Sequence, residues 1–506
     1  MLASLRSAAL FGVDAFPVHV EVDVSFGFPH FTMVGLPDAT VRESRDRVRA
    51  AIRNSGFDFP EHRITVNLAP ADVRKAGSSF DLPIALGLLA ASGPLTRRAI
   101  ADTIVLGELS LDGGINAIRG VLPIAVASRA SGARRLLLPP SNAAEASVIE
   151  GLEVCTVRSL AEAVEALNHP DAVTVVPRPA APLTPASTST DGGDLAEVRG
   201  QLLPRRAIEV AAAGGHNLLM IGPPGGGKTM MARRMAGILP PLTFEEALEC
   251  TAIHSVAGTL PGGTGLMTAR PFRAPHHTIS NVALVGGGSI PRPGEISLAH
   301  NGVLFLDEIP EFQRRVLEVL RQPLEEGRVT VARAARTAVF PARFVLIGAM
   351  NPCPCGYLGD QRRACRCTPN QIHGYRSRLS GPLRDRIDLV VDVGAVPVSV
   401  LADSPAGEPS AAVRHRVLAA RERQRSRYAS VGLRTNAEIR GGLASVACQP
   451  TPDGQRLLRT AAERLRLTAR GYDRVLKVAR TIADLADAPS VDADHLAEAL
   501  QYRLLE

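Results

Sequence analysis

A glycine-rich stretch at residues 222–229, GPPGGGKT, contains the residue types that bind the phosphates of a nucleotide. Its glycines let the backbone curl, so that successive N–H groups and the start of a helix face the phosphates. Lys228 is predicted to reach the β- and γ-phosphates, and the Thr229 hydroxyl to hold Mg²⁺. The residues predicted to bind the nucleotide are Gly222, Pro223, Pro224, Gly225, Gly226, Gly227, Lys228, Thr229 and Asp307.

Two adjacent carboxylates supply the second half of an ATP-hydrolysing site. Asp307 and Glu308 directly follow the apolar run 303–306, which is predicted to be a buried strand. Asp307 is predicted to bind Mg²⁺, and Glu308 to orient and polarise the attacking water. A carboxylate pair at a strand end can also be a solvated turn, but together with the phosphate loop it favours ATP hydrolysis.

Further polar residues are candidates to sense the γ-phosphate. Asn351 directly follows the apolar run FVLIGAM, where its amide can position the attacking water. Arg384 and Arg386 follow a Gly-Pro turn, and an arginine there can reach the γ-phosphate of a neighbouring subunit. Arg470 lies near the start of an amphipathic helical pattern, with Arg474 one turn later, and a lid arginine can touch the nucleotide from there. The alternative for Arg384 and Arg386 is an ordinary salt bridge.

Four of the seven cysteines lie close together after Asn351, in the order CxC, nine residues, CxC. Four thiolates are a ligand set for one tetrahedral Zn²⁺, which would be structural because no coordination position stays open. The alternative is a set of ordinary thiols. The predicted zinc ligands, which would pin the loop after Asn351, are Cys353, Cys355, Cys365 and Cys367.

These residues need a scaffold that brings their strand ends together. The apolar runs 218–221, 303–306 and 344–350 are predicted strands, and a helical pattern follows the phosphate loop. Strands joined through helical patterns in this order are typical of an α/β domain.

Length and composition indicate a globular protein of several domains. The 506 residues favour about three domains, and the net charge of +7 permits nucleic-acid binding. No apolar run approaches the roughly 18 residues that span a bilayer, and the N-terminus has no clear signal-peptide anatomy. We therefore expect a cytoplasmic protein, in whose reducing environment clustered cysteines favour metal binding over disulfides.

Several longer segments carry a family resemblance over essentially the whole chain. They are FRAPHHTISNVALVGGG, PRPGEISLAHNGVLFLDEIPEF, and NPCPCGYLGD before YRSRLSGPLRDRIDL. In their order and amino-acid sequence they resemble the YifB/ComM family of magnesium-chelatase-like AAA+ ATPases, whose core is similar to those of magnesium chelatase and the MCM helicases.

The resemblance implies a function and roles for single residues. It implies an ATP- and Mg²⁺-dependent motor on single-stranded or branched DNA, assembled as a hexameric ring, that acts as a branch-migration helicase in DNA recombination during natural transformation. By this similarity Asn351 matches the first sensor, Arg386 the arginine finger, and Arg470 the second sensor, with Arg474 as its alternative.

The N-terminal region resembles the proteolytic domain of Lon and the related domain of RadA, an α+β fold of the ribosomal S5 domain 2 type. In this alignment Ser79 falls on Lon's nucleophile, but Ser128 stands where Lon has its lysine base. Lys75 lies upstream, in a loop where another role is favoured. We therefore predict a Lon-like fold without protease chemistry, in which Ser79 and Asp81 are structural or turn residues.

The resemblance and the composition together divide the chain into domains. Residues 1–175 form the predicted N-terminal domain, and the Pro-, Ala-, Ser- and Thr-rich stretch 176–194 is a predicted linker. The ATPase core follows at 195–396, and a helical lid domain at 397–506.

Two segments are candidates for contact with DNA. A predicted β-hairpin precedes the strand that leads to Asn351 and carries Arg333 and Arg336 beside its tip, where they can grip phosphates without reading sequence. His276 and His277 are candidates for a second pore-facing insertion, with metal ligation or a plain loop as alternatives.

Two other classes of function share parts of this pattern. A chelatase-like motor that remodels a protein partner would use the same ATPase core. A Lon-like ATP-dependent protease would need a catalytic base near Ser79, and Ser128 argues against it.

Overall fold

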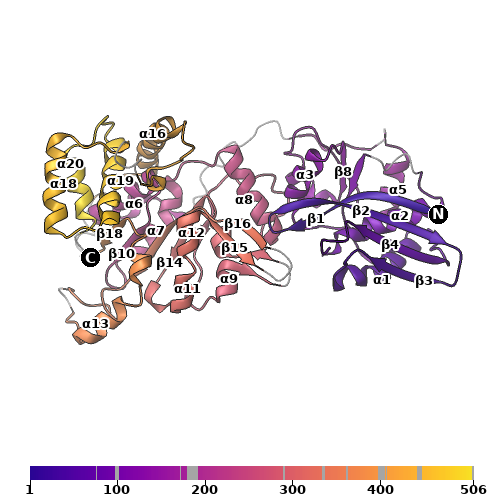
Figure 1. Ribbon diagram of the computed structural model, residues 1–506, viewed down its shortest axis with the longest axis horizontal. Coiled ribbons are helices and arrows are strands. Elements are labelled where there is room, and N and C mark those ends of the chain that lie inside the picture. The colour runs from indigo at the N-terminus through magenta and orange to yellow at the C-terminus, as the bar shows by residue number, and fades with distance from the viewer. Residues whose placement is uncertain are drawn as a thin grey trace.

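Two large β-sheets organise the chain in the computed structural model (Figure 1). The N-terminal domain occupies one end of the long axis, a central domain the middle, and a group of C-terminal helices the other end. The structure describes residues 1–75, 77–96, 102–170, 173–178, 192–288, 291–332, 337–360, 363–396, 405, 407–441 and 447–503. Within these segments, no helix has both the length and the hydropathy that crossing a bilayer requires.

The N-terminal domain is built on a mixed sheet of seven strands, in the order β3-β4-β2-β1-β5-β8-β9. Val18, Val20 and Val22 of β2 are buried, because alternate side chains of a strand point to the same face. The strands are β1 (Leu2–Phe11), β2 (Asp14–Ser25), β3 (His30–Val34), β4 (Arg63–Ala69), β5 (Thr103–Val105), β8 (Arg135–Leu138) and β9 (Glu153–Thr156), with a separate pair β6 (Glu108–Leu109) and β7 (Ile115–Asn116). The helices are α1 (Ala39–Asn54), α2 (Asp81–Ser92), α3 (Val121–Ala130), α4 (Ala143–Ala146) and α5 (Leu160–Asn168).

The central domain contains a five-stranded sheet in which every neighbouring pair of strands is parallel. Its order is β11-β14-β17-β10-β18. The strands are β10 (Leu218–Ile221), β11 (Phe272–Arg273), β14 (Gly302–Leu306), β17 (Phe344–Met350) and β18 (Leu389–Asp392). Because parallel strands end at the same edge, the residues after β10, β14 and β17 come together there. The predicted mixed α/β class is confirmed.

Helices cover both faces of this sheet. Leu218 and Met220 of β10 pack with α6 and α7 on one face, whereas Leu219 packs on the opposite face with α9 to α12 and a hairpin. The central helices are α6 (Leu202–Gly214), α7 (Lys228–Ile238), α8 (Phe244–Ala257), α9 (Asn281–Val285), α10 (Glu295–Leu298), α11 (Arg314–Glu318), α12 (Arg321–Glu326), α13 (Pro369–Arg376) and α14 (Gly381–Arg384). Two short strands, β12 (Gly286–Gly287) and β13 (Arg292–Pro293), pair with each other.

The C-terminal part is helical, as predicted, and shares a core with α6 and α7. Val413 and Val417 of one helix and Val475 of another are buried in that common cluster. The helices are α16 (Ser410–Tyr428), α18 (Pro452–Arg464), α19 (Ala469–Leu485) and α20 (Ala493–Gln501).

Most of the predicted linker 176–194 lies outside the described residues. Val176 still donates a backbone hydrogen bond to Val154 at the edge strand β9, so pairing with the N-terminal domain continues at least that far. Asp194 accepts hydrogen bonds from the backbone of Ala196 and of Ser410, which places it within the packed central and C-terminal parts.

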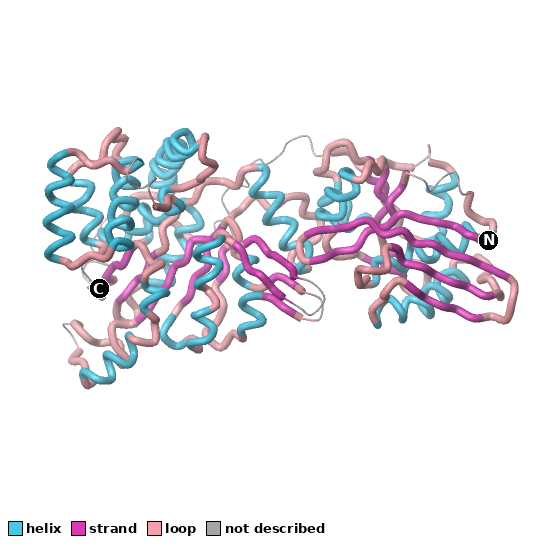
Figure 2. The backbone as a smooth tube through the Cα atoms, in the orientation of Figure 1, coloured by secondary structure: helices cyan, strands magenta, loops and turns pink. Residues whose placement is uncertain are grey.

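The predicted hairpin is present in its two strands, β15 (Arg328–Ala332) and β16 (Thr337–Pro341), which pair antiparallel up to Ala332 and Thr337. Arg333 and Arg336, the predicted DNA contacts, lie outside the described residues. Figure 2 shows the β1–β2 turn of the N-terminal domain beside this hairpin. Phe11 and Val13 of that turn pack against the cluster that contains Phe340 of β16.

Candidate active site

The phosphate loop lies between β10 and α7, where the sequence predicted it. Gly225 and Gly227 have φ angles of +79° and +85°, a conformation that side chains other than glycine rarely adopt. A Cβ atom on Gly222 would lie 2.1 Å from the carbonyl oxygen of Val393, just after β18. The loop therefore needs glycine at these positions for backbone reasons, before any phosphate binds.

Lys228 is buried at the start of α7, and its ammonium group lies inside the loop. Its Nζ donates to the carbonyl oxygens of Gly222 at 2.6 Å and Pro223 at 2.9 Å, and to Asn351 Oδ1 at 3.3 Å. Burial lowers the pKa of Lys228, and the nearby charges of Asp307 and Glu308 oppose that shift. The ammonium is thus held at the place where phosphate oxygens would replace the loop carbonyls as its partners.

Thr229 and Asp307 meet although 78 residues separate them in the sequence. The Thr229 hydroxyl donates to Asp307 Oδ2 at 2.6 Å. The parallel register of β10, β17 and β14 makes this contact possible, because it aligns the ends of the three strands. A hydroxyl and a carboxylate side by side are oxygen ligands suited to Mg²⁺.

Glu308 has an unusual backbone conformation for a residue that is not glycine. Its φ is +49°, in the left-handed region, and its backbone N–H donates to Asp307 Oδ1 at 3.0 Å. The side chain is 55% exposed, and His277 is its nearest ion-pair partner in the described part of the chain. The carboxylate can therefore reach solvent water at the sheet edge, as a general base must.

Asn351 follows β17, between the strands that lead to Lys228 and to Asp307. Its side-chain oxygen contacts Lys228, and its backbone hydrogen-bonds the hydroxyl of Tyr375 in α13. Burial raises the pKa of Tyr375 to about 12, so the phenol stays protonated at neutral pH. Asn351 is thus fixed from both sides at the site.

Arg386 and Arg384 lie on the α14 segment and have different surroundings. Arg386 donates to the carbonyl of Pro382 and pairs with Glu325 of α12, whereas Arg384 is exposed. Within the described segments, neither arginine has a hydrogen bond or ion pair with Lys228, Thr229 or Asp307.

The two arginines of α19 also differ. Arg474 is buried and donates to the backbone carbonyls of Arg384 at 3.3 Å and Ile387 at 3.0 Å. Arg470 is 71% exposed, and its Nη1 lies 3.7 Å from Asp385 Oδ2. Arg474 is therefore engaged in holding the lid to the α14 segment, whereas Arg470 remains available to a ligand.

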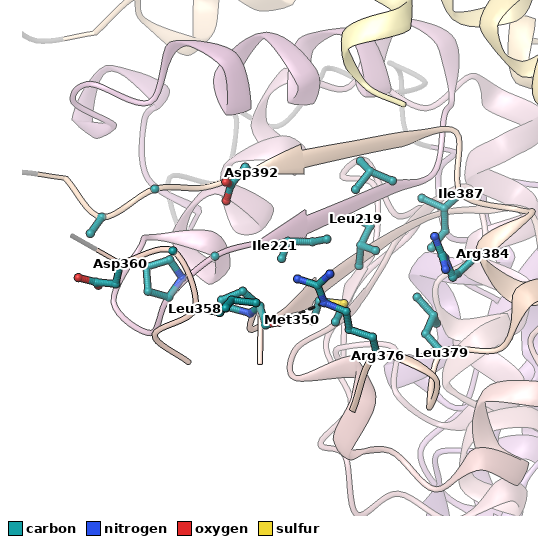
Figure 3. A pocket seen from close by; sticks show the side chains of 17 residues that line it. Leu219, Ile221, Met350, Leu358, Asp360, Arg376, Leu379, Arg384, Ile387 and Asp392 are labelled. Atoms are coloured by element: carbon teal, nitrogen blue, oxygen red, sulfur yellow. Dashed lines mark hydrogen bonds between the residues drawn. The ribbon is translucent and has the colours of Figure 1, made fainter. Parts of the chain in front are cut away.

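A cavity of about 540 Å³ adjoins the phosphate loop, on the sheet face opposite α7 (Figure 3). Leu219, Ile221 and Met350 line its apolar part, and Arg376 and Arg384 lie along one side. This cavity could not be predicted from the sequence, because its lining comes from separate segments that only the fold brings together.

The four cysteines of the predicted zinc site are gathered in one cluster. Their sulfur atoms all lie within 4.8 Å of one another, and Cys353 Sγ is 3.4 Å from Cys355 Sγ and 3.7 Å from Cys365 Sγ. Four thiolates about 2.3 Å from a tetrahedral Zn²⁺ would be about 3.8 Å apart, so the cluster fits the ion. Backbone hydrogen bonds from Arg366 and Tyr357 lower the pKa of Cys355 to about 6, which favours the thiolate form that binds metal.

The N-terminal domain does not assemble a serine protease site in the described residues. Ser128 is buried in α3, and its hydroxyl donates to the carbonyl of Ile124 at 2.6 Å. Asp81 is buried at the start of α2 and accepts two hydrogen bonds from Arg47, although burial raises its pKa to about 6. No hydrogen bond joins the hydroxyl of Ser79 to a basic side chain in these parts of the chain.

The fold and site together define a class of protein. A parallel sheet with a phosphate loop, a carboxylate pair after a second strand and a polar sensor between them is the arrangement of a magnesium-chelatase-type AAA ATPase, which uses ATP and Mg²⁺. Three family models match the chain, described as "Magnesium chelatase, subunit ChlI" over residues 194–401, "Subunit ChlI of Mg-chelatase" over 20–142 and "Magnesium chelatase, subunit ChlI C-terminal" over 407–503.

The chain belongs to the YifB/ComM family of proteins related to magnesium chelatase subunit ChlI. It is 46% identical to the uncharacterized protein YifB of Salmonella typhimurium, over 100% of this chain and 97% of that protein. It is 44% identical to YifB of Escherichia coli over the same shares. It is 45% identical to the competence protein ComM of Haemophilus influenzae, over 100% of this chain and 98% of ComM.

Proposed function

We propose that this ATPase is a motor on DNA, a hexameric branch-migration helicase of the ComM type that serves recombination during natural transformation. The observation that carries the proposal is the 45% identity to competence protein ComM along the full length of both chains. The contacts of Lys228, Asp307 and Asn351 at the sheet edge, and the exposed carboxylate of Glu308 beside them, support the proposed roles of these residues. DNA-stimulated ATPase activity and unwinding of branched DNA by the purified protein test the proposal.

The β15–β16 hairpin is the proposed link between DNA and the ATP site. Its second strand leads within three residues to β17, and Asn351 directly follows the end of β17 at Met350. A pull on the hairpin would therefore act on the strand that leads to Asn351, whose side-chain oxygen accepts a hydrogen bond from Lys228. The N-terminal domain supports the same hairpin through Phe11 and Val13, which suggests that it braces the DNA-contacting element.

Replacing Arg333 and Arg336 together by alanine should weaken DNA binding about equally for unrelated sequences, while basal ATPase activity stays near wild type. The reason is that DNA binding releases fewer counterions when a phosphate contact is lost. Each lost contact therefore flattens the slope of log affinity against log salt by roughly 0.7 to 0.9. Affinity titrations at several salt concentrations measure the slope.

The matched control removes the same charge elsewhere, by Arg45→Ala with Arg456→Ala on the exposed faces of α1 and α18. That control should leave the slope as in wild type. An unchanged slope in the hairpin variant would exclude the hairpin from the path of DNA.

The cysteine cluster is the proposed site of a structural Zn²⁺. Cys353 is buried two residues after Asn351, and Arg376 Nε donates to the carbonyl of Pro352 at 3.2 Å. A Cβ on Gly356 would lie 2.8 Å from Pro224 Cδ, so the cysteine loop packs directly on the phosphate loop. Zinc bound there would fix the loop that follows Asn351 and packs on Pro224 of the phosphate loop.

Cys365→Ser should lose bound zinc, lower the melting temperature and reduce ATPase activity, because three thiolates hold the ion more weakly and the loop against Pro224 loosens. Metal analysis of the purified protein should give about one zinc per wild-type chain, as four thiolates bind one ion. Cys448→Ala, which removes a buried thiol outside the cluster, should retain the zinc. A zinc-free wild-type protein with full activity would contradict the assignment.

The N-terminal domain is proposed to have a Lon-like fold without protease activity, which the burial of Ser128 supports.

An ATPase that remodels a protein partner is the second candidate function, because the matching family models describe a magnesium chelatase subunit. ATPase activity that ignores DNA would favour that candidate over the DNA motor.

A further inference from the structure

His277 lies beside the carboxylate that we assign to water activation. Its Nδ1 is 3.9 Å from Glu308 Oε2. This separation is within ion-pair range but too long for a direct hydrogen bond. A small rotation of the exposed Glu308 side chain would bring its carboxylate within hydrogen-bond distance of Nδ1. Neither the phosphate loop nor the carboxylate motif includes this histidine.

The sheet register explains why the two residues meet. Strand β11 pairs parallel with β14, with Arg273 opposite Leu304. His277 and Glu308 each lie four residues beyond these partners, at the carboxyl edge where the nucleotide site forms. His277 is thus placed beside Glu308 by strand β11, whereas Glu308 itself follows strand β14.

The segment that carries His277 is anchored on both sides. At its base, Arg273 donates to both carboxylate oxygens of Glu295 at 2.7 Å, a bidentate pair that raises the pKa of the guanidinium. The His277 ring meets Phe312 edge-on, with centroids 6.4 Å apart, and the His276 ring at 4.1 Å. These two rings therefore limit the orientations that the imidazole can adopt.

Glu308 needs such a partner because its own side chain is poorly confined. Its backbone is fixed by Asp307, but the carboxylate is 55% exposed and free to sample several rotamers. A general base is effective only while it lies within hydrogen-bond reach of the water that it activates. A nearby donor that limits these rotamers would raise the fraction of time spent in reach.

We propose that His277 is a positioning residue for Glu308, holding its carboxylate toward the attacking water through Nδ1. The inference rests on the proposed role of Glu308 and adds to it the residue that orients the base. His277 takes no proton from water and touches no phosphate in this scheme.

His277→Ala should lower kcat for ATP hydrolysis by about 10- to 100-fold and leave the KM for ATP unchanged, because the base is misplaced while the phosphate loop stays intact. His277→Asn should recover much of the loss, since its amide nitrogen replaces Nδ1 as a donor near Glu308. His415→Ala is the matched control, because it removes an exposed imidazole from α16. Steady-state kinetics and melting curves of the full-length chain measure these effects.

Three results would overturn the inference. They are a wild-type kcat in His277→Ala, equal losses in the alanine and asparagine variants, and a fall in melting temperature that accompanies the loss in both. Glu308→Gln separates this inference from the proposed function. If Glu308→Gln hydrolyses ATP normally, the role of Glu308 is wrong; if it is inactive while His277→Ala is normal, only the role of His277 is wrong.

Discussion

Glu308→Gln should bind ATP about as tightly as the wild-type chain and hydrolyse it roughly 10²- to 10⁴-fold more slowly, the range expected for loss of a general base. The amide cannot accept the proton of the attacking water, but it keeps the shape of the side chain. The fold should tolerate the change, because the side chain is 55% exposed and the backbone N–H of residue 308 still reaches Asp307. Titration with a fluorescent nucleotide and phosphate-release kinetics separate binding from hydrolysis.

Lys228→Ala should show the opposite division, with tight ATP binding itself lost. Its ammonium group lies inside the loop that would surround the phosphates, where it contacts the carbonyls of Gly222 and Pro223, and alanine leaves this loop without a cation.

Glu311→Gln is the control for Glu308→Gln, because Glu311 lies three residues after Glu308 and pairs with Arg378 on the surface. Normal hydrolysis by Glu308→Gln, or a slow Glu311→Gln, would assign the base elsewhere.

Arg386→Ala should bind ATP and hydrolyse it about 10³- to 10⁵-fold more slowly, the effect of removing an arginine finger. In the single chain Arg386 pairs with Glu325 and has no contact with Lys228 in the described residues, so its proposed target is the site of a neighbouring subunit. On assembly, Arg386 would exchange its ion pair with Glu325 for the γ-phosphate bound by the neighbouring subunit. Its positive charge would then stabilise the transition state there. Hydrolysis assays with single and mixed variants test this.

Mixing Arg386→Ala with Lys228→Ala should restore part of the activity. Some interfaces then combine an intact Lys228 from one subunit with an intact Arg386 from the other. Arg321→Ala, which removes a half-exposed arginine paired with Glu318 in α12, should behave as wild type. Absence of recovery at every mixing ratio, with co-assembly demonstrated, would place the role of Arg386 within its own subunit.

The local parts of the site were predictable because each depends on contiguous residues. The strands before Lys228, Asp307 and Asn351 were read from apolar runs and formed at 218–221, 302–306 and 344–350. Buried parallel strands are short continuous apolar segments, and the phosphate loop has a fixed spacing, so a one-dimensional pattern specifies both. The helix that begins beside Arg470 was predictable for the same reason, since its apolar residues recur with helical periodicity.

The spacing of the cysteines was likewise enough to identify a candidate metal cluster. It did not show that Gly356 of the same loop would pack on Pro224, because that contact joins two strand ends across the sheet. The sequence placed Arg470 and Arg474 one turn apart, with Arg470 as the predicted second sensor and Arg474 as its alternative. Burial distinguished them, since Arg474 donates to backbone carbonyls near α14 while Arg470 stays exposed.

What the sequence determined by itself was therefore the chemistry carried by each segment: the phosphate loop, the carboxylate pair, the sensor and the thiols. The tertiary structure decided which segments meet. Thr229 contacts Asp307 across 78 residues, and His277 reaches Glu308 from a different strand, because a parallel sheet aligns strand ends that are distant in sequence. Such contacts depend on strand order and register, which are set by packing over the whole domain and leave no periodic signal in any one segment.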